Sequence, residues 1–246
     1  MTDTNHLGQP VGFPVPHWTP RSRPPARALA GYWCRLEPLA PSQHADDLYQ
    51  ANSMDELGRM WTYLPYGPFE DFGSYRKWLE SVATFEDPLF FAIVGREHGR
   101  AIGLAAFLRV NPPDGGIEVG HLAFSPALQA TTAATEAMAL MMAMVFDELE
   151  YRRYEWKCDA LNAPSRRAAL RFGFVYEGTF RHALIVKGRN RDTAWFSITD
   201  TEWPRLKAAY QRWLAPDNFG ADGRQRAALS ELTRPIAEPS DTPDTT

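Results

Sequence analysis

Two short segments of the sequence carry residue types that could bind and activate a ligand. In the first, the loop Ser125–Thr131 leads into Thr132-Ala133-Ala134, small residues that open a predicted helix. The first N–H groups of a helix have no partner within it, and the helix dipole is positive at this end. Because small residues let a phosphate approach the backbone closely, the segment is a candidate anion site. An ordinary strand-to-helix turn with a threonine cap fits the same residues.

The second segment follows a predicted strand and contains Asn162 and Ser165. Residues three apart lie on one side of a helical turn, so this amide and this hydroxyl could hold polar groups of one ligand. Alternatively, Asn162 caps the helix and Ser165 forms a hydrogen bond in its first turn. Cys158, at the end of the preceding strand, has no cysteine-hydrolase signature around it and is interpreted as a buried structural residue.

Both segments must be positioned by a sheet and its helices. Apolar or alternating runs predict strands, and apolar residues at three- and four-residue steps predict helices. The predicted strands are 32–39, 89–94, 101–110, 117–124, 154–158, 174–186 and 193–198. The predicted helices are 43–51 with Ser42 as its cap, 54–61, 69–83, 132–150, 162–172 and 202–214. This order predicts a mixed α/β domain with one sheet covered by helices.

Composition excludes several classes of protein. Apolar residues make up 44% of the 246 residues and aromatic residues 13%, so a large core can form. The net charge of −4 argues against a general nucleic-acid binder. The longest apolar run, Ala137 to Phe146, is too short to cross a bilayer, which needs about 20 residues. The six histidines show no HxxxH spacing and the two cysteines no CxxC, so no metal site is expected.

The two ends of the chain differ from the middle. Residues 1–27 are rich in proline, which predicts an extended arm outside the sheet. Phe13 and Trp18 in this arm suit packing on its own domain or, alternatively, on a partner subunit. Residues 215–246 form a predicted tail whose last residues are expected to be disordered. The start of the chain has no secretory signal, and two distant cysteines suit a reducing compartment, so a cytoplasmic location is predicted.

The order of these segments resembles the GNAT superfamily, whose members transfer acetyl groups from acetyl-coenzyme A to amines. The resemblance rests on the anion-binding loop before a buried helix and on Asn162-x-x-Ser165-x-Arg167 with Gly173-Phe174. It covers about residues 28–214 and is strongest to the branch of ribosomal-protein N-terminal acetyltransferases. It implies an α/β (α+β) fold with a single domain over 28–214. The expected sheet is mixed and mostly antiparallel, with helices on both faces and a splay between its two central parallel strands.

The resemblance also implies how acetyl-coenzyme A would be bound, without a metal. Its pantetheine would lie along the strand that ends at Phe124, and its pyrophosphate would meet the loop before the helix. The family loop usually has a glycine where this sequence has Thr132, which leaves less room for the pyrophosphate. The expected cofactor-binding residues are Leu122, Ala123, Phe124, Gln129, Ala130, Thr131, Thr132, Ala133, Ala134, Asn162, Ser165 and Arg167.

Two residues are the candidates for catalysis. An attacking amine must be neutral, yet a free α-amino group has a pKa of about 8, so a base is needed. Glu118, on the central strand just before the splay, is the candidate base; alternatively it only orients the amine or pairs with a cation. Ser165 is the candidate acid for the leaving thiolate, or else a hydrogen-bonding residue of the helical turn.

The function predicted from these residues is direct transfer of an acetyl group to a primary amine in a ternary complex. The acceptor would be a protein N-terminus or an aminoacyl or peptide-like small molecule. The aromatic loop from Trp61 to Phe72 and the pair Trp195-Phe196 would flank its cleft. Alternatively, the altered loop at Thr132 marks a catalytically degenerate domain that binds a coenzyme A ester or a protein partner. A homodimer is compatible with the arm, and neither nucleic acid nor membrane is an expected partner.

Overall fold

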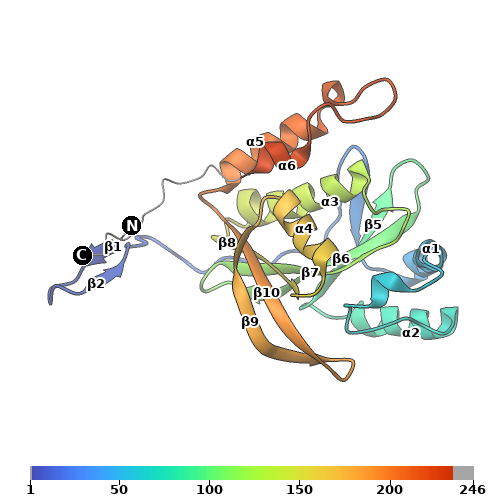
Figure 1. Ribbon diagram of the computed structural model, residues 1–246, viewed down its shortest axis with the longest axis horizontal. Helices are drawn as coiled ribbons and strands as arrows, with labels where there is room; N and C mark the ends of the chain where they lie inside the picture. Colours follow the sequence, from blue (N-terminus) through green and yellow to red (C-terminus); the bar gives the residue numbers. More distant parts are fainter. Residues whose placement is uncertain (1, 235–246) are drawn as a thin grey trace.

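The computed structural model describes residues 2–234, which fold around one eight-stranded sheet (Figure 1). The strand order is β3-β4-β5-β6-β7-β8-β10-β9, and only the central neighbours β7 and β8 run parallel. The mixed, mostly antiparallel sheet predicted from the sequence is therefore confirmed. The strands are β3 (Leu29–Ala30), β4 (Cys34–Pro38), β5 (Leu89–Gly95), β6 (Ala101–Asn111), β7 (Gly116–Phe124), β8 (Arg153–Asp159), β9 (Val175–Val186) and β10 (Arg189–Thr199).

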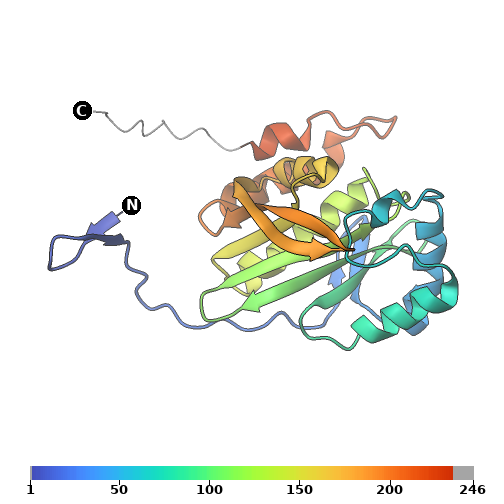
Figure 2. The same cartoon turned by 60° about the horizontal axis from the view of Figure 1, so that its bottom comes forward.

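Helices cover both faces of the sheet, as expected (Figures 1 and 2). Helices α1 (Pro41–Ser53) and α2 (Phe72–Val82) pack on one face, and α3 (Thr132–Ala143), α4 (Ala163–Arg171), α5 (Trp203–Leu214) and α6 (Leu229–Thr233) lie on the other. Strand β5 shows why both layers form. Phe91 and Ile93 join the core under α3, and Phe90 and Val94 join the core under α1 and α2. A strand apolar on both faces must be covered twice.

The two central strands separate halfway along their length. The β7–β8 pairing starts at Gly116 opposite Arg153 and ends at Val119 opposite Trp156. Beyond this point β7 stays paired with β6, and β8 stays paired with β10. A shift in the β6–β7 register falls around His121, whose φ is 51°. An extra residue in one strand bends it, which accounts for the divergence and confirms the expected splay.

Three predicted helices differ from the observed ones. Helix α1 begins at Pro41 rather than after Ser42; no side chain caps it, and Ala40 N–H donates to His44 Nδ1. The predicted helix 54–61 is a single turn, Arg59–Trp61, because Gly58 precedes it in a left-handed conformation. The predicted helix 132–150 ends as an α-helix at Ala143 and continues as a wider turn to Glu148.

The arm has two parts. Trp18 Nε1 donates to Pro113 O, and Tyr151 Oη donates to Ser22 O, so this stretch lies against the domain. Before it, β1 (Thr2–Thr4) and β2 (Pro10–Gly12) form a short antiparallel hairpin. The prediction of an extended arm did not include this hairpin. This hairpin stands away from the sheet in Figures 1 and 2.

The tail also has structure. A single turn at Pro216–Asn218 and helix α6 follow α5, and Leu229 of α6 is fully buried in the core shared with α5. Thr233 Oγ1 donates to Arg171 O, which ties α6 to the end of α4. The residues predicted to be disordered, near 240–246, lie outside the described residues.

One buried carboxylate fixes the start of α3 against the sheet. Glu136 accepts backbone N–H groups from Tyr32, Trp33 and Cys34 at 2.7, 2.6 and 2.8 Å. Gly31 lies so close that an added Cβ would be 2.3 Å from a Glu136 oxygen, so a side chain at this position would displace the carboxylate. Because Glu136 is in the second turn of α3, this contact holds the helix N-terminus beside β4.

Replacing Glu136 with glutamine tests this contact. We expect the free energy of unfolding to fall by about 3 kcal/mol, because the amide group offers one acceptor oxygen and leaves buried N–H groups unpaired. The matched control is Glu80→Gln, in an exposed i, i+4 pair with Arg76, where the loss should stay below about 0.5 kcal/mol. Urea denaturation measures both, and equal losses would show that the Glu136 contact is unimportant.

Candidate active site

The edge of β7 beyond the splay offers unpaired backbone groups. Ser125 N–H donates to Ile102 O, and Ala123 lies opposite Leu104. Because successive N–H groups alternate between the two edges of a strand, those of Leu122 and Phe124 point away from β6, towards the gap. Gln129 Nε2 donates to Phe124 O, so the side chain of Gln129 also lies at this edge. Of the three predicted donors on β7, Leu122 and Phe124 thus face the gap and Ala123 faces β6.

The N-terminus of α3 keeps two free donors. Thr131 is the N-cap, and its Oγ1 accepts the Ala134 N–H at 3.1 Å. Within residues 2–234, the N–H groups of Thr132 and Ala133 donate to no acceptor. Ala130, before the cap, adopts a left-handed conformation with φ 59°. The threonine cap that the sequence offered as the alternative to an anion site is therefore present. It pairs with the N–H of Ala134 and leaves the N–H groups of Thr132 and Ala133 available.

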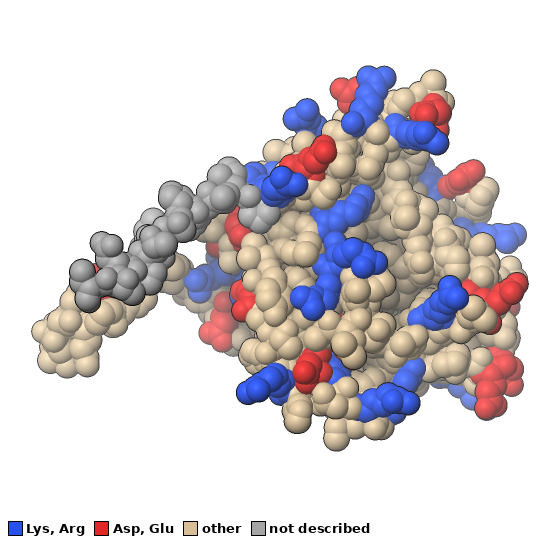
Figure 3. Space-filling model, viewed as in Figure 1, with Lys and Arg blue, Asp and Glu red and all other residues tan. Residues whose placement is uncertain are grey.

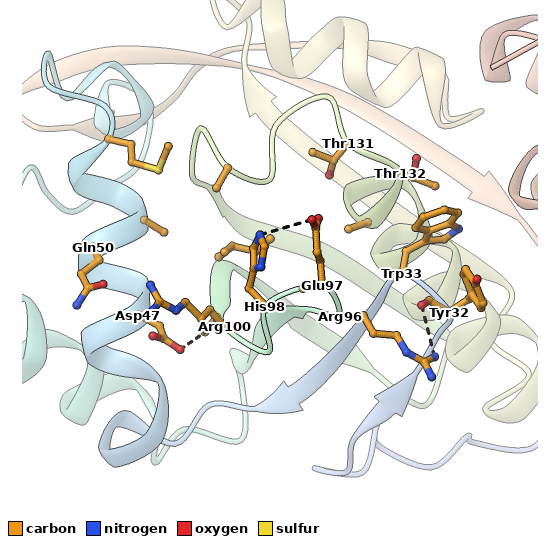
Figure 4. Close-up of a pocket in the computed structure, with 17 residues that line it drawn as sticks. Tyr32, Trp33, Asp47, Gln50, Arg96, Glu97, His98, Arg100, Thr131 and Thr132 are labelled. Carbon is orange, nitrogen blue, oxygen red and sulfur yellow. Dashed lines mark hydrogen bonds and ion pairs between the residues drawn. The ribbon is translucent and has the colours of Figure 1, made fainter. Parts of the chain in front are cut away.

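These residues border a cavity of about 920 Å³ (Figure 4). Thr131, Thr132 and Ala133 form one wall, and the opposite wall comes from α1 and the turn between β5 and β6. Figure 4 shows Arg96 near Tyr32; its Nη1 donates to Gly31 O at 3.3 Å. Arg100 lies on the same turn, and the carboxylates Asp47 and Glu97 also line the cavity, so its lining carries both signs of charge.

The start of α4 uses both of its predicted ligand-binding residues in local hydrogen bonds. Asn162 is the N-cap, and its Oδ1 accepts the Ser165 N–H at 3.1 Å. Ser165 Oγ accepts from Trp156 Nε1 at 3.0 Å. These contacts leave the Asn162 amide N–H₂ free to donate, whereas the Ser165 hydroxyl also lies beside the Cys158 thiol. The helix-capping alternative is thus observed, and it is compatible with ligand binding.

A cation that sequence reasoning missed lies at the first turn of α3. Arg171 Nη1 donates to Thr135 Oγ1 at 3.1 Å, and burial lowers the pKa of Arg171. The predicted residue Arg167 lies one turn earlier on α4 and is exposed. Figure 3 shows basic side chains gathered over α4 beside a hollow in the surface. The sequence feature that could have identified Arg171 is its i, i+4 spacing from Arg167, which places both side chains on one side of the helix.

Glu118 lies on β7 one residue before the last pairing with β8, and 3% of its surface is exposed. Its Oε2 contacts Arg109 Nη1 at 2.7 Å and Lys157 Nζ at 2.9 Å. Its Oε1 accepts no hydrogen bond from the described part of the chain. A buried carboxylate needs neighbouring groups of opposite charge, and Arg109 and Lys157 supply them. Glu118 therefore presents one free carboxylate oxygen where β7 and β8 part.

Further charges extend this ion pair across the sheet. Lys157 also contacts Glu155 at 2.7 Å, and Arg153 bridges Glu155 and Glu177. Hydrogen bonds from Arg153 lower the pKa of Glu177. The result is a line of alternating charges from β6 to β9 in which each buried charge faces an opposite one.

His121, at the bulge of β7, is held in an aromatic setting. Its ring lies 4.9 Å from Phe90 and 5.7 Å from Tyr66, and its Nδ1 is 3.3 Å from the Tyr66 hydroxyl. Burial, aided by the charge of Arg109, lowers the pKa of His121 to about 4, and burial raises the pKa of Tyr66. Both side chains are therefore neutral near pH 7 and can exchange hydrogen bonds without carrying charge.

The aromatic loop reaches across to the other side of the splay. Tyr63 Oη donates to Leu161 O in the β8–α4 loop at 3.2 Å. Lys187, in the β9–β10 turn, donates from Nζ to Trp61 O at 2.8 Å. These two contacts place the aromatic loop next to both segments. That this loop and the pair Trp195-Phe196 flank an acceptor cleft stays a prediction, and Phe196 is instead buried in the core.

Comparison with known proteins shows which family has this arrangement. The family model described as acetyltransferase (GNAT) domain matches residues 34–175, more than half of the chain. The chain therefore belongs to the GNAT family, and it is an acyl-CoA-dependent acetyltransferase. No curated protein matches it.

Solved structures agree with this family. A GCN5-related N-acetyltransferase from Brucella melitensis is 46% identical, with a TM-score of 0.87 over 89% of this chain and 99% of that one. A candidate GNAT acetyltransferase from Chromobacterium violaceum is 39% identical, with a TM-score of 0.74 over 80% and 98% of the two chains. A candidate ribosomal-protein-serine acetyltransferase from Vibrio cholerae, 18% identical with a TM-score of 0.61 over 70% and 97%, shows the fold alone.

Residues 2–234 contain neither a cluster of metal-binding side chains nor a helix that could span a membrane. No group of three or more histidine, cysteine, aspartate or glutamate side chains is arranged to hold a metal ion. No helix in this part of the chain is long and apolar enough to span a membrane.

The lowered pKa of His121 predicts a pH-dependent stability. The unfolded chain takes up a proton near its ordinary pKa of about 6.5, whereas folded His121 does so only near pH 4. The contribution of neutral His121 to stability is therefore complete above the unfolded pKa, and it is lost as the pH falls from about 6.5 to about 4. Between about pH 7.5 and pH 5 this amounts to roughly 2 kcal/mol.

Urea denaturation of a His121→Asn variant measures this loss, because asparagine tolerates the left-handed backbone and does not titrate. We expect the variant to lose about 2 kcal/mol less than the wild type over this pH interval. The same pH dependence in both proteins would contradict the assignment to His121.

Proposed function

We propose that the protein transfers the acetyl group of acetyl-CoA directly to the primary amine of a peptide-like acceptor. The observation that carries this proposal is the separation of β7 from β8 after Val119, one residue beyond Glu118. It leaves the N–H groups of Leu122 and Phe124 unpaired at the same gap as a carboxylate oxygen that has no partner in residues 2–234.

The residues around the gap fit acetyl-CoA. The free N–H groups of Thr132 and Ala133, with Arg171 beside them, suit the negative charge of the pyrophosphate. The unpaired edge of β7 and the amide of Asn162 suit the polar groups of pantetheine. When bound, the thioester supplies the activated acetyl group.

Each catalytic residue has a defined task in this proposal. Glu118 Oε1 takes the proton of the acceptor ammonium, directly or through water, so that the amine nitrogen can bond to the acetyl carbonyl carbon. The N–H groups of Leu122 and Phe124 stabilise the charge that develops on the carbonyl oxygen. The carbon–sulfur bond then breaks, and the second proton of the attacking nitrogen passes through Ser165 or water to the leaving thiolate, which gives the amide and the free thiol. The residues favour a ternary complex because Cys158 is buried, with a pKa raised by burial, and so is poorly suited to carry an acetyl group.

One observation favours the second candidate, a domain that binds a coenzyme A ester without turnover. Thr131 occupies the Ala134 N–H, so the loop keeps fewer donors for the pyrophosphate than a glycine-rich loop would. Acetyl transfer is the better-supported function, because the carboxylate of Glu118 and the unpaired β7 edge lie at the same gap. The two free, buried cysteines suit a reducing compartment, and we propose the cytoplasm.

The proposed activity is tested by incubating the protein with acetyl-CoA and a panel of peptides and simple amines. Mass spectrometry should find an added acetyl group on a peptide N-terminus, with release of an equal amount of free coenzyme A. Binding of acetyl-CoA with no acetylation of any amine would favour the non-catalytic alternative.

The role of Glu118 is tested by Glu118→Gln. We expect kcat to fall by roughly 10²-fold and its pH dependence to change, because the amide cannot accept the proton. The affinity for acetyl-CoA should stay unchanged. Glu155→Gln is the control, since it also removes a carboxylate partner of Lys157. A normal rate in Glu118→Gln would exclude Glu118 as the base, and equal losses in both variants would assign the effect to the ion pairs.

A further inference from the structure

Lys157 is the first residue of β8 beyond its pairing with β7. The last paired residues are Val119 and Trp156, and one position earlier Glu118 lies opposite Glu155. Alternate residues of a strand share a face, so Lys157 and Glu155 project to the same side of the sheet. Lys157 therefore lies where the two strands part, and its ammonium group contacts both carboxylates.

Three partners surround the ammonium nitrogen of Lys157. Its Nζ lies 2.9 Å from Glu118 Oε2, 2.7 Å from Glu155 Oε2 and 3.8 Å from the centre of the Trp195 ring. An ammonium group has three N–H donors, and the face of an indole ring attracts a cation. Only 8% of the Lys157 side chain is exposed. Because these contacts occupy its donors, any effect of Lys157 on a reaction must pass through its partners.

Lys157 and Arg109 hold the same oxygen of Glu118. Arg109 Nη1 contacts Oε2 at 2.7 Å, whereas Oε1 lies towards Gly120, where an added Cβ would be 3.7 Å from it. The two cations differ in burial, since 55% of the Arg109 side chain is exposed. Water screens an exposed charge much more than a buried one. Lys157 is therefore the stronger determinant of the orientation and charge of Glu118.

Glu155 keeps Lys157 paired when Glu118 is neutral. In the proposed reaction, Glu118 takes a proton from the acceptor ammonium and releases it to solvent before the next turnover. A lysine paired with Glu118 alone would then be a buried charge without a partner, which is costly. Glu155 contacts the same ammonium group and is itself paired with Arg153. The cluster thus suits a carboxylate that gains and loses a proton in each cycle.

We propose that Lys157 is a positioning residue that holds Glu118 with Oε1 free to accept the proton, while Glu155 keeps Lys157 paired when that proton arrives. This inference rests on the proposed function and adds to it two residues that act through Glu118 without contacting the substrate. Removing the cation and removing its second carboxylate should therefore change the protonation of Glu118 in opposite directions.

Lys157→Met tests the first half, because it removes the charge and keeps the length of the side chain. A nearby cation favours the charged form of a carboxylate, so the pH at which kcat is half-maximal should rise by about one unit. Loss of the orienting contact should lower the maximal kcat about tenfold, with KM for acetyl-CoA unchanged. Lys207→Met is the control and should change none of these values, since Lys207 pairs with Asp147 on the exposed side of α5.

Glu155→Gln tests the second half without removing Lys157. The variant loses a neighbouring negative charge, and Lys157 keeps Glu118 as its one carboxylate partner. Both changes favour the charged form of Glu118, so the pH of half-maximal kcat should fall. A merely structural disturbance would shift neither midpoint, or would shift both in the same direction.

A second readout observes Glu118 directly and needs no turnover. The other groups near it are Arg109 on β6, which stays charged, and His121 on β7, which takes up a proton near pH 4. NMR of isotope-labelled glutamate carboxyl groups separates Glu118 from both, because its signal is absent in Glu118→Gln. Its titration midpoint should rise in Lys157→Met and fall in Glu155→Gln.

The outcomes separate the inference from the function on which it rests. Midpoints equal to the wild type, or a lower kcat in Lys157→Met without a shifted midpoint, would overturn the inference and leave acetyl transfer intact. If the wild type acetylates no amine, the proposed function fails, and the NMR midpoints decide separately whether Lys157 and Glu155 control Glu118. If Lys157→Met does not fold, the direction of the shift in Glu155→Gln decides the matter.

Discussion

The separation of β7 and β8 after Val119 and Trp156 is the constraint on which the rest of the site depends. Backbone groups of a central strand are normally paired on both edges, and unpaired ones are costly when buried. Here the bulge at His121 bends β7 and leaves one edge open. The open edge lies near the N-terminus of α3, where the free N–H groups of Thr132 and Ala133 suit negative charge. The fold thus creates the proposed cofactor site by interrupting its own sheet.

The same separation explains the buried charges. Glu118 and Lys157 sit on the two strands at the point where they part, close enough for a 2.9 Å contact. Arg109 and Glu155 complete the neutralisation from either side. Removing one member of such a buried set leaves another charge unpaired, which is far more costly than losing an exposed ion pair. The site can therefore hold the buried carboxylate of Glu118, because Arg109 and Lys157 balance its charge.

Much of this arrangement could be predicted from the sequence. Residue periodicity identified the buried helix, the small residues after Thr131 made its start a candidate anion site, and the resemblance supplied the splay. The prediction missed contacts that depend on packing between distant segments. Arg171 reaches α3 only because α4 folds beside it, and Glu136 meets residues about a hundred positions away. The three partners of Lys157 could not be foreseen, since such contacts are decided by the complete fold. Ser42 failed as a cap because Pro41 already starts the helix.

The central claim is that the open β7 edge and the α3 N-terminus together bind acetyl-CoA. Isothermal titration of the full chain with acetyl-CoA, coenzyme A and succinyl-CoA tests it most directly. The account predicts micromolar binding of acetyl-CoA, weakened about tenfold by Arg171→Ala and unaffected by Arg212→Ala, an exposed arginine of α5. Absence of binding for all three compounds would contradict it and would mean that the loop containing Thr132 no longer accepts a pyrophosphate.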